Sequence, residues 1–220
     1  MNSKALWQLT MMVLAIAAAG SACADTSRVN GSISIAANQQ EGDVETVNGA
    51  ISIGERATVK EVQTVNGAIK LSAGAHAREV SSVNGAIQLG EGAAVSGEVS
   101  VVNGTVQLDK GASVEGKLST VNGRIELTAA HLGGDLETVN GALLVGADSR
   151  LDGDIRVRKP GNSWFTSNSR PVRVVIGPRA VVKGRLKFER PVKLYVSSTA
   201  KTGSITGALP ISYTGDRPPD

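Results

Sequence analysis

The chain has 220 residues and a formal net charge of +3, with 26 glycines, one cysteine and only two residues each of Trp, Tyr and Phe. An aromatic content of 3% is unusual for the large core of a globular enzyme, whereas 41% hydrophobic and 20% charged residues exclude a disordered composition. We therefore expect a core of small and β-branched aliphatic side chains in a repetitive β architecture.

Residues 1–24 have the order of a secretory signal peptide: a single lysine, an apolar run and then small residues. The apolar run is too short to span a bilayer and is interrupted by polar residues, and no later apolar segment of the sequence is longer. Ala22 and Ala24 form an A-x-A cleavage site, and the alternative is acylation of Cys23 as in a bacterial outer-membrane lipoprotein. We expect export to the periplasm or beyond, and a lone cysteine allows no disulfide within the chain.

From residue 25 onward the sequence repeats. Val-Asn-Gly occurs seven times at intervals of 18 or 19 residues, and aliphatic residues follow each valine at distances of four and six residues. Period-two alternation is typical of strands, and 18 residues suit a coil of about three short strands. The pattern predicts an all-β, single-stranded β-solenoid (a parallel β-helix) of nine or ten coils. The alternative, a stack of antiparallel hairpins, requires matching strands around each Asn-Gly, which the other glycines do not delimit.

The repeated asparagine is predicted to have a structural role. Asn and Gly tolerate positive φ, so the pair can turn the chain at each corner. Amides in register can also bond one another, and neither Asp nor Ser ever replaces the asparagine, which favours a ladder over seven independent turns. The sequence leaves open whether the valine before each asparagine or the residue before that valine faces inward. The predicted ladder consists of Asn30, Asn48, Asn66, Asn84, Asn103, Asn122 and Asn140.

Residues 25–157 form the regular repeat region. The Val-Asn-Gly corner then disappears, and residues 158–171 are predicted to form an inserted loop because they are rich in chain-breaking residues. Alternation resumes over residues 172–213, which predicts basic terminal coils and a cap. We expect residues 214–220 to form a flexible tail.

The Val-Asn-Gly-x-Ile-x-Leu units, over about residues 29–157, resemble the bacterial adhesin-repeat family, an exported group of unknown function. The Ala-x-Val-x-Gly-x-Leu stretches at residues 112–118 and 180–186 are similar to bactofilins, which are polymer-forming right-handed β-helices. This second resemblance implies a right-handed coil, although bactofilins are generally cytoplasmic and this chain has an export signal. Either resemblance implies a structural or binding protein, and neither family supplies a catalytic motif.

Charge divides the chain after the signal peptide into two parts. Residues 25–155 contain 9 Lys or Arg and 17 Asp or Glu, whereas residues 156–220 contain 13 and 3. The basic part also holds every aromatic residue beyond the signal peptide. Cations that alternate with apolar residues project from one sheet face, and exposed rings beside them predict an anion-binding surface. The alternative is a solvated face that protects a β edge. The candidate residues are Arg173, Arg179, Lys183, Arg185, Lys187, Arg190, Lys193, Trp164 and Tyr195.

These features predict a non-catalytic adhesin-like or scaffolding protein of the bacterial cell envelope, without a cofactor. The expected partner is envelope polysaccharide, lipopolysaccharide or another protein, and nucleic acid is least favoured because no nucleic-acid motif is present. The first alternative is head-to-tail self-assembly between the acidic and basic ends. The second is a carbohydrate-active enzyme that uses Asp152 and Asp154 as paired carboxylates. His76 and His131 lie about three coils apart and predict no shared metal site.

Overall fold

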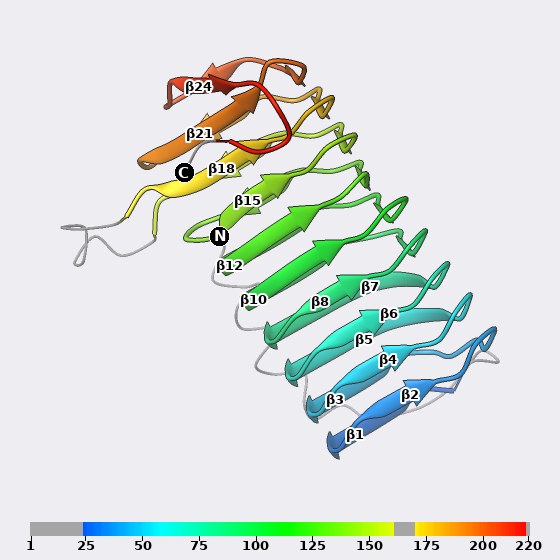
Figure 1. Ribbon diagram of the computed structural model, residues 1–220. Helices are drawn as coiled ribbons and strands as arrows, with labels where there is room; N and C mark the ends of the chain where they lie inside the picture. Colours follow the sequence, from blue (N-terminus) through cyan, green and yellow to red (C-terminus); the bar gives the residue numbers. More distant parts are fainter. Residues whose placement is uncertain (1–23, 161–169, 219–220) are drawn as a thin grey trace.

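The structure is a computed structural model that describes residues 24–160 and 170–218. The described residues form 24 short β-strands and no α-helix, and the chain winds through about nine turns (Figure 1). The β-solenoid predicted from the repeat is therefore confirmed. Residues 1–23 of the predicted signal peptide, including Cys23, lie outside the described residues, and so does Trp164 of the inserted loop.

Parallel pairing between successive coils divides the strands into three series, which we call faces A, B and C. Face A consists of β1 (Thr26–Asn30), β3 (Val44–Asn48), the ends of β5 (Thr58–Asn66) and β7 (His76–Asn84), the starts of β10 (Val99–Leu108) and β12 (Leu118–Leu127), β14 (Leu136–Thr138), β17 (Ile155–Val157), β20 (Leu186–Phe188) and β23 (Ile205–Thr206). Face B consists of β2 (Ile33–Ile35), β4 (Ile51–Ile53), β6 (Ile69–Leu71), β8 (Ile87–Leu89), the ends of β10 and β12, β15 (Ala142–Val145), β18 (Val172–Ile176), β21 (Val192–Ser197) and β24 (Pro210–Tyr213). Face C consists of the starts of β5 and β7, β9 (Ala94–Val95), β11 (Ser113–Val114), β13 (His131–Leu132), β16 (Arg150–Leu151), β19 (Val181–Val182) and β22 (Lys201–Thr202).

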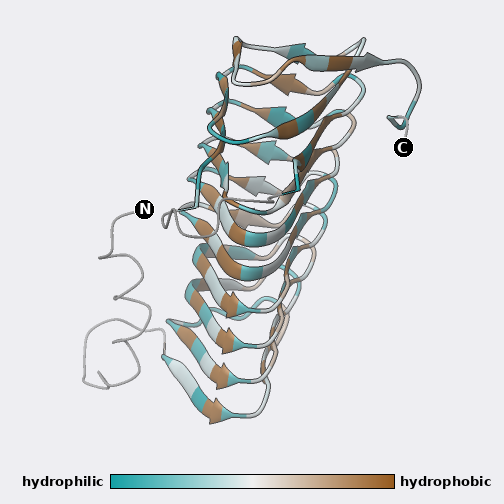
Figure 2. Ribbon diagram, turned by 90° about the vertical axis from the view of Figure 1, so that its left-hand side faces the viewer, coloured by the Kyte–Doolittle hydropathy of each residue, from teal (hydrophilic) through white to brown (hydrophobic). Residues whose placement is uncertain are grey.

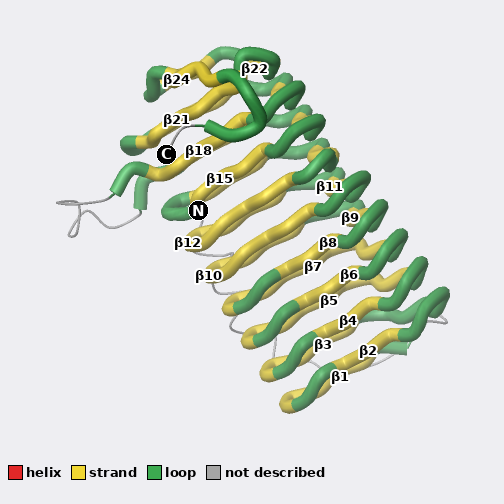
Figure 3. The backbone as a smooth tube through the Cα atoms, in the orientation of Figure 1, coloured by secondary structure: helices red, strands yellow, loops and turns green. Residues whose placement is uncertain are grey.

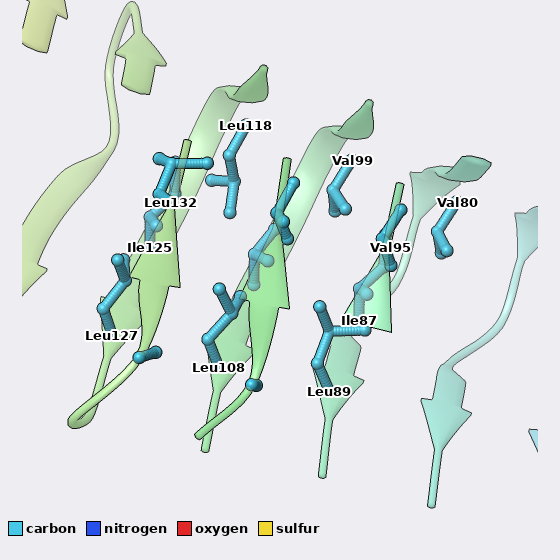
Figure 4. Close-up of a cluster of buried hydrophobic side chains, with 14 of the residues drawn as sticks. Val80, Ile87, Leu89, Val95, Val99, Leu108, Leu118, Ile125, Leu127 and Leu132 are labelled. Atoms are coloured by element: carbon cyan, nitrogen blue, oxygen red, sulfur yellow. The ribbon is translucent and has the colours of Figure 1, made fainter. Parts of the chain in front are cut away.

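The core is made of aliphatic side chains that stack in columns along the solenoid (Figure 4). On face B, Ile33 pairs with Ile51 and Ile51 with Ile69, so that one inward position is repeated in every coil. The residues between them point outward, which gives the alternation of hydrophobic and hydrophilic positions seen in Figure 2. Because the repeat length equals one coil, aliphatic residues spaced by 18 or 19 positions in sequence become neighbours in space.

Burial shows which of the two residues before each ladder asparagine faces inward, a point that the sequence left open. Thr46 and Thr64, which precede the Val-Asn-Gly valine, are buried, while the valine after each is only half-buried. The two threonine hydroxyls donate to the carbonyl oxygens of Gly31 and Gly49, both at 3.3 Å. The inward threonine therefore satisfies a carbonyl at the corner of the preceding coil, which an aliphatic residue cannot do.

The seven asparagines form the predicted ladder. Each side-chain amide from Asn48 to Asn140 donates from Nδ2 to the Oδ1 of the asparagine one coil earlier, at 2.9 to 3.0 Å. All seven side chains lie at the solvent-exposed surface of the corner. After the last amide, Arg190 donates from Nη1 to Oδ1 of Asn140 and to the carbonyl oxygen of Val139. All hydrogen bonds of the ladder thus point the same way along the stack, and the oxygen of the last amide is bonded by the Arg190 cation.

From Gly49 onward, the glycine of each Asn-Gly is required mainly by close approach between coils, whereas a Cβ atom on Gly31 of the first coil would meet no atom within 4 Å. A Cβ atom placed on Gly85 would lie 1.8 Å from the carbonyl oxygen of Gly67, one coil earlier. Gly31 does take a positive φ of 112°, as expected, whereas none of the seven ladder asparagines has a positive φ. The prediction that both residues supply conformational freedom at the corner therefore holds for Gly31 and not for the asparagines, which contribute their side-chain amides instead.

A second corner, between faces B and C, uses a left-handed residue in successive coils. The described residues at this position are Asn38, Arg56, Gly74, Gly92, Gly111, Ala129, Asp148 and Arg179, with φ between 45° and 73°. Figure 3 shows loops at this corner along the whole stack. No motif marked this corner in the sequence, because five residue types occupy it.

The stack continues past the inserted loop without a change of register. Residues 158–171 connect β17 to β18, yet Ile155 pairs with Leu186, and Leu143 with Val174. The terminal coils predicted for residues 172–213 are therefore present. Residues 214–218, which we expected to belong to a flexible tail, turn back towards face B outside β18 (Figure 1) and line a groove there.

Candidate anion-binding site

Coil-to-coil stacking places the basic part of the chain directly on the last acidic coil. Asp152, which follows β16 on face C, accepts hydrogen bonds from Lys183 Nζ at 2.9 Å, from Arg150 Nε at 3.1 Å and from His131 Nε2 at 3.1 Å. Hydrogen bonds from Lys183 and His131, assisted by the charge of Arg150, lower the pKa of Asp152 to about 2. Its carboxylate therefore stays ionised at neutral pH.

Asp154 lies at the corner between faces C and A and is held in a similar way. Its Oδ1 accepts the backbone N–H of Arg185 at 2.8 Å, and its Oδ2 accepts Arg156 Nη2 at 2.9 Å. These contacts, the backbone hydrogen bond foremost, lower its pKa. A general acid requires a raised pKa, so the environment of Asp152 and Asp154 does not favour the paired-carboxylate enzyme that the sequence raised as an alternative.

Glu137 forms a third contact of this kind on face A. Burial alone would raise its pKa, but hydrogen bonds from Lys117 and Arg158 outweigh burial and lower it. The distances are 2.6 Å from Lys117 Nζ and 2.7 Å from Arg158 Nη1 to the two carboxylate oxygens. In the seventh coil, which contains β14, β15 and β16, carboxylates thus bind cations of the preceding coil and of the following coil.

Most of the predicted anion-binding cations have partners within the protein. Arg179 forms a two-pronged ion pair with Asp148, at 2.6 Å for each contact. Lys183 and Arg185 bind Asp152 and Asp154. Further along the chain, Lys187 Nζ lies 3.1 Å from Glu189 Oε1, and Arg190 ends the asparagine ladder as described above.

The prediction that Lys183, Arg185 and Lys187 project from one sheet face is wrong. Lys183 follows β19 on face C, Arg185 lies at the corner next to Gly184, and Lys187 points outward from β20 on face A. The alternation in sequence continues through a corner, so successive cations turn with the chain. Period-two spacing cannot show where one strand ends and the next face begins.

Arg173 and Lys193 behave differently from the other predicted cations. They pair with each other in register on β18 and β21 of face B. Both side chains are exposed, and neither forms an ion pair with any residue that the structure describes. The Arg173 guanidinium lies 5.0 Å from the ring centroid of Tyr195, a cation–π contact that holds it over β21.

The rings expected to be exposed beside the cations are buried in the described part of the chain. Tyr195 is 5% exposed, Tyr213 6% and Phe188 5%. Tyr195 and Tyr213 pack with Val175 on the outside of face B, and the Tyr213 hydroxyl donates to the carbonyl oxygen of Ile176 at 3.2 Å. Burial raises the pKa of Tyr213. These rings hold the C-terminal segment on face B instead of offering a stacking platform.

This arrangement creates a groove of about 500 Å³ on the outside of face B, between the C-terminal segment and strands β12, β15 and β18. Its charged lining groups include Arg173 from the predicted set. The others are Arg124, Glu126, Asp216 and Arg217, which the sequence argument missed. Arg124 was missed because it belongs to the acidic part of the chain, and only the stacking of coils brings it near Arg173.

Within the described ranges, no group of three or more His, Cys, Asp or Glu side chains is arranged to hold a metal ion. The same residues include no helix with the length and apolar character needed to cross a membrane. Comparisons of the chain with protein-family models, with curated proteins and with solved structures found no match. The resemblances to adhesin repeats and to bactofilins therefore stay predictions from their sequence motifs.

Proposed function

We propose that this protein is a non-catalytic, exported β-solenoid of the bacterial cell envelope, adhesin-like or scaffolding, that binds an anionic partner through its basic terminal coils. One observation carries the proposal. The stack neutralises Arg179, Lys183 and Arg185 through internal carboxylates but leaves Arg173 and Lys193 adjacent, exposed and without an ion pair in the described part of the chain. Adjacent cations without internal partners attract an anionic ligand.

The proposal is tested by binding of an acidic polysaccharide, polygalacturonate, to purified protein lacking the predicted signal peptide. We expect the Arg173→Gln/Lys193→Gln variant to lose most of the binding. The matched control is Lys183→Gln/Lys187→Gln, which removes the same net charge at positions whose cations are already paired. Equal binding by the two variants and the parent protein, or equal loss in both variants, would contradict the proposal.

A second candidate function, head-to-tail self-assembly, is favoured by a separate observation. The large hydrophobic residues that are exposed in the described structure, Val29 at 66%, Leu209 at 90% and Ile211 at 46%, all lie in the first or last coil. Strands at the two ends of a stack also carry unpaired backbone groups, which favour pairing with another chain.

Light scattering at low and high salt distinguishes the two functions. Large species that dissociate as salt rises would support pairing between the acidic and basic ends, because salt screens charges. A monomer at both salt concentrations would exclude self-assembly at the protein concentrations used and leave the terminal coils available for another partner.

A further inference from the structure

The groove on face B owes its shape to one small residue between two large ones. Ala142 of β15 pairs with Arg124 of β12, and the register of β15 on β18 places it next to Arg173. Two coil steps put the Cα atoms of these arginines about 10 Å apart. Ala142 and Leu144 of β15 and Gly146, which follows this strand, all line the groove. The hollow therefore runs along the direction of β15.

Donors and acceptors both line this groove. Arg124 Nη1 lies 3.8 Å from Glu126 Oε2, and both side chains remain partly exposed to the groove. Arg173 and Arg217 have no ion pair with a described residue, and Asp216 completes the charged lining. The lining thus carries three guanidinium groups and two carboxylates, which makes it mildly basic.

Most of the remaining lining residues are apolar, and Thr128 is a polar exception. Leu144 and Val175 contribute outward side chains, and Tyr213, which packs in the same cluster, and Pro218 complete this part of the lining. A volume of about 500 Å³ is within the range of sites for small ligands. Such a lining suits a ligand with an apolar surface on its body and hydroxyl or carboxylate groups at its edges.

We propose that this groove binds a short acidic oligosaccharide composed of uronic acid residues. A planar carboxylate of the sugar accepts hydrogen bonds from Arg173 and Arg217, the geometry that guanidinium groups favour. Sugar hydroxyls donate to Glu126 and Asp216, while the C–H face of the ring packs on Leu144. The two carboxylates of the groove repel a polyanion of higher charge density, such as polyphosphate, which gives selectivity for a chain with one carboxylate per sugar. This inference rests on the proposed function and names its ligand class and site.

The test changes the shape of the groove without changing its charge. In Ala142→Phe, a large side chain fills the hollow, and the fold is expected to tolerate it because arginines occupy the same outward position in the neighbouring coils. The matched control is Ala68→Phe, which has the equivalent exposed position after the Asn-Gly of the third coil. Binding of oligogalacturonate is measured by calorimetry, with a neutral maltooligosaccharide and inorganic polyphosphate as comparison ligands.

We expect Ala142→Phe to weaken oligogalacturonate binding by at least about tenfold, with no change in Ala68→Phe. Arg124→Gln is a second variant in case Ala142→Phe fails to fold, and it is expected to weaken binding as well. Unchanged binding in both groove variants, or preference for polyphosphate over oligogalacturonate, would overturn the inference. If Arg173→Gln/Lys193→Gln then still abolished binding, the proposed function would stand without the groove. If the parent protein bound no anion at all, the proposed function and the groove proposal would both be overturned.

Discussion

At the scale of single residues, the inward column on face A contains one hydroxyl that lacks a partner. Ser82 occupies the position of Thr64 in the next coil, and its buried Oγ has no hydrogen bond to a described group. In the following coil the same position holds Val101, which is buried as well. An unpaired buried hydroxyl lowers stability, and the neighbouring valine shows that an aliphatic side chain fits the column.

We therefore expect Ser82→Val to raise the free energy of unfolding by about 1 kcal/mol. Urea denaturation followed by circular dichroism measures the change. The control is Thr64→Val, whose hydroxyl bonds the carbonyl oxygen of Gly49, so this variant loses a hydrogen bond and is expected to be destabilised. A destabilised Ser82→Val would mean that the Ser82 hydroxyl has a partner that stabilises the folded chain.

At the scale of the coil, glycine is required for two different reasons, which substitution by alanine separates. In Gly85→Ala the new Cβ collides with the carbonyl oxygen of Gly67, and the coils must move apart. In Gly92→Ala the new Cβ meets no atom within 4 Å, but φ is +65°. We expect Gly92→Ala to cost about 1 kcal/mol, the usual cost of a left-handed conformation, and Gly85→Ala to cost clearly more. Thermal unfolding compares the two, and equal melting temperatures would contradict the close-approach argument.

The junction between the seventh and eighth coils is held by ionised carboxylates and therefore responds to acid. The pKa values of Asp148, Asp152, Asp154 and Glu137 are all lowered in the folded protein, that of Asp152 to about 2. The unfolded chain then binds more protons than the folded chain in the acid range. The contribution of these groups to stability is complete above about pH 5, where the carboxylates of the unfolded chain are ionised as well, and is lost as the pH falls towards about 2.

We expect the urea midpoint of the parent protein to fall over this pH range, and Asp152→Asn to flatten part of the fall while lowering stability at neutral pH. The control is Glu91→Gln, which removes a carboxylate from an exposed turn with no ion pair among the described residues. Hydrogen exchange should show that the coils after β17 open first in acid. Parallel pH profiles for the parent protein and Asp152→Asn would contradict this assignment.

The coil could be predicted from the sequence because two of its features recur in coil after coil with the same residues or the same class of residue. The Asn-Gly corner and the aliphatic columns recur at every 18 or 19 residues, so their stacking followed from the period alone. The corner between faces B and C could not be predicted, because the left-handed residue there is Arg56 in one coil, Ala129 in another and Asp148 in a third. Backbone geometry is conserved along the stack at this corner while side-chain chemistry is not.

At the scale of the whole molecule, charge composition indicated the region of the candidate site but not its members. The count of cations indicated the terminal coils and included Arg173, yet several of the other candidates form ion pairs with carboxylates of a neighbouring coil. Arg124 lies 49 positions before Arg173 in the sequence, separated from it by the inserted loop, and joins the same groove. Pairing across coils depends on the register after an insertion of unknown path, which one sequence does not give.

The register across the insertion leads to a prediction about the loop. In the ninth coil, three residues connect Phe188 to Val192, whereas 14 residues connect Val157 to Val172 at the same corner. Replacing residues 159–171 by Asn-Gly keeps Arg158 and leaves a three-residue connection. We expect the variant to fold with the same circular dichroism spectrum and to gain about 1 kcal/mol, because the shorter loop costs less closure entropy.

Thermal unfolding and light scattering check this loop variant. A direct join of Val157 to Val172 serves as the control, since it is too short for the corner and should shift or disorder the terminal coils. Loss of the strand spectrum in the Asn-Gly variant would show that the inserted residues themselves stabilise the last coils.

The asparagine ladder also has a chemical consequence. In flexible chains Asn-Gly is prone to spontaneous deamidation, in which the glycine nitrogen attacks the side-chain carbon, a five-membered imide forms and ammonia leaves. Here the backbone N–H groups of Gly31, Gly49 and Gly67 each donate to the backbone carbonyl oxygen of the asparagine in the following coil, at 2.9 to 3.0 Å. The amides that would be attacked are fixed in the ladder, and one conversion to aspartate would place a negative charge between two amide neighbours. We therefore expect the rate of deamidation at the seven Asn-Gly sequences to depend on how often the coils open, and much less on the intrinsic reactivity of Asn-Gly.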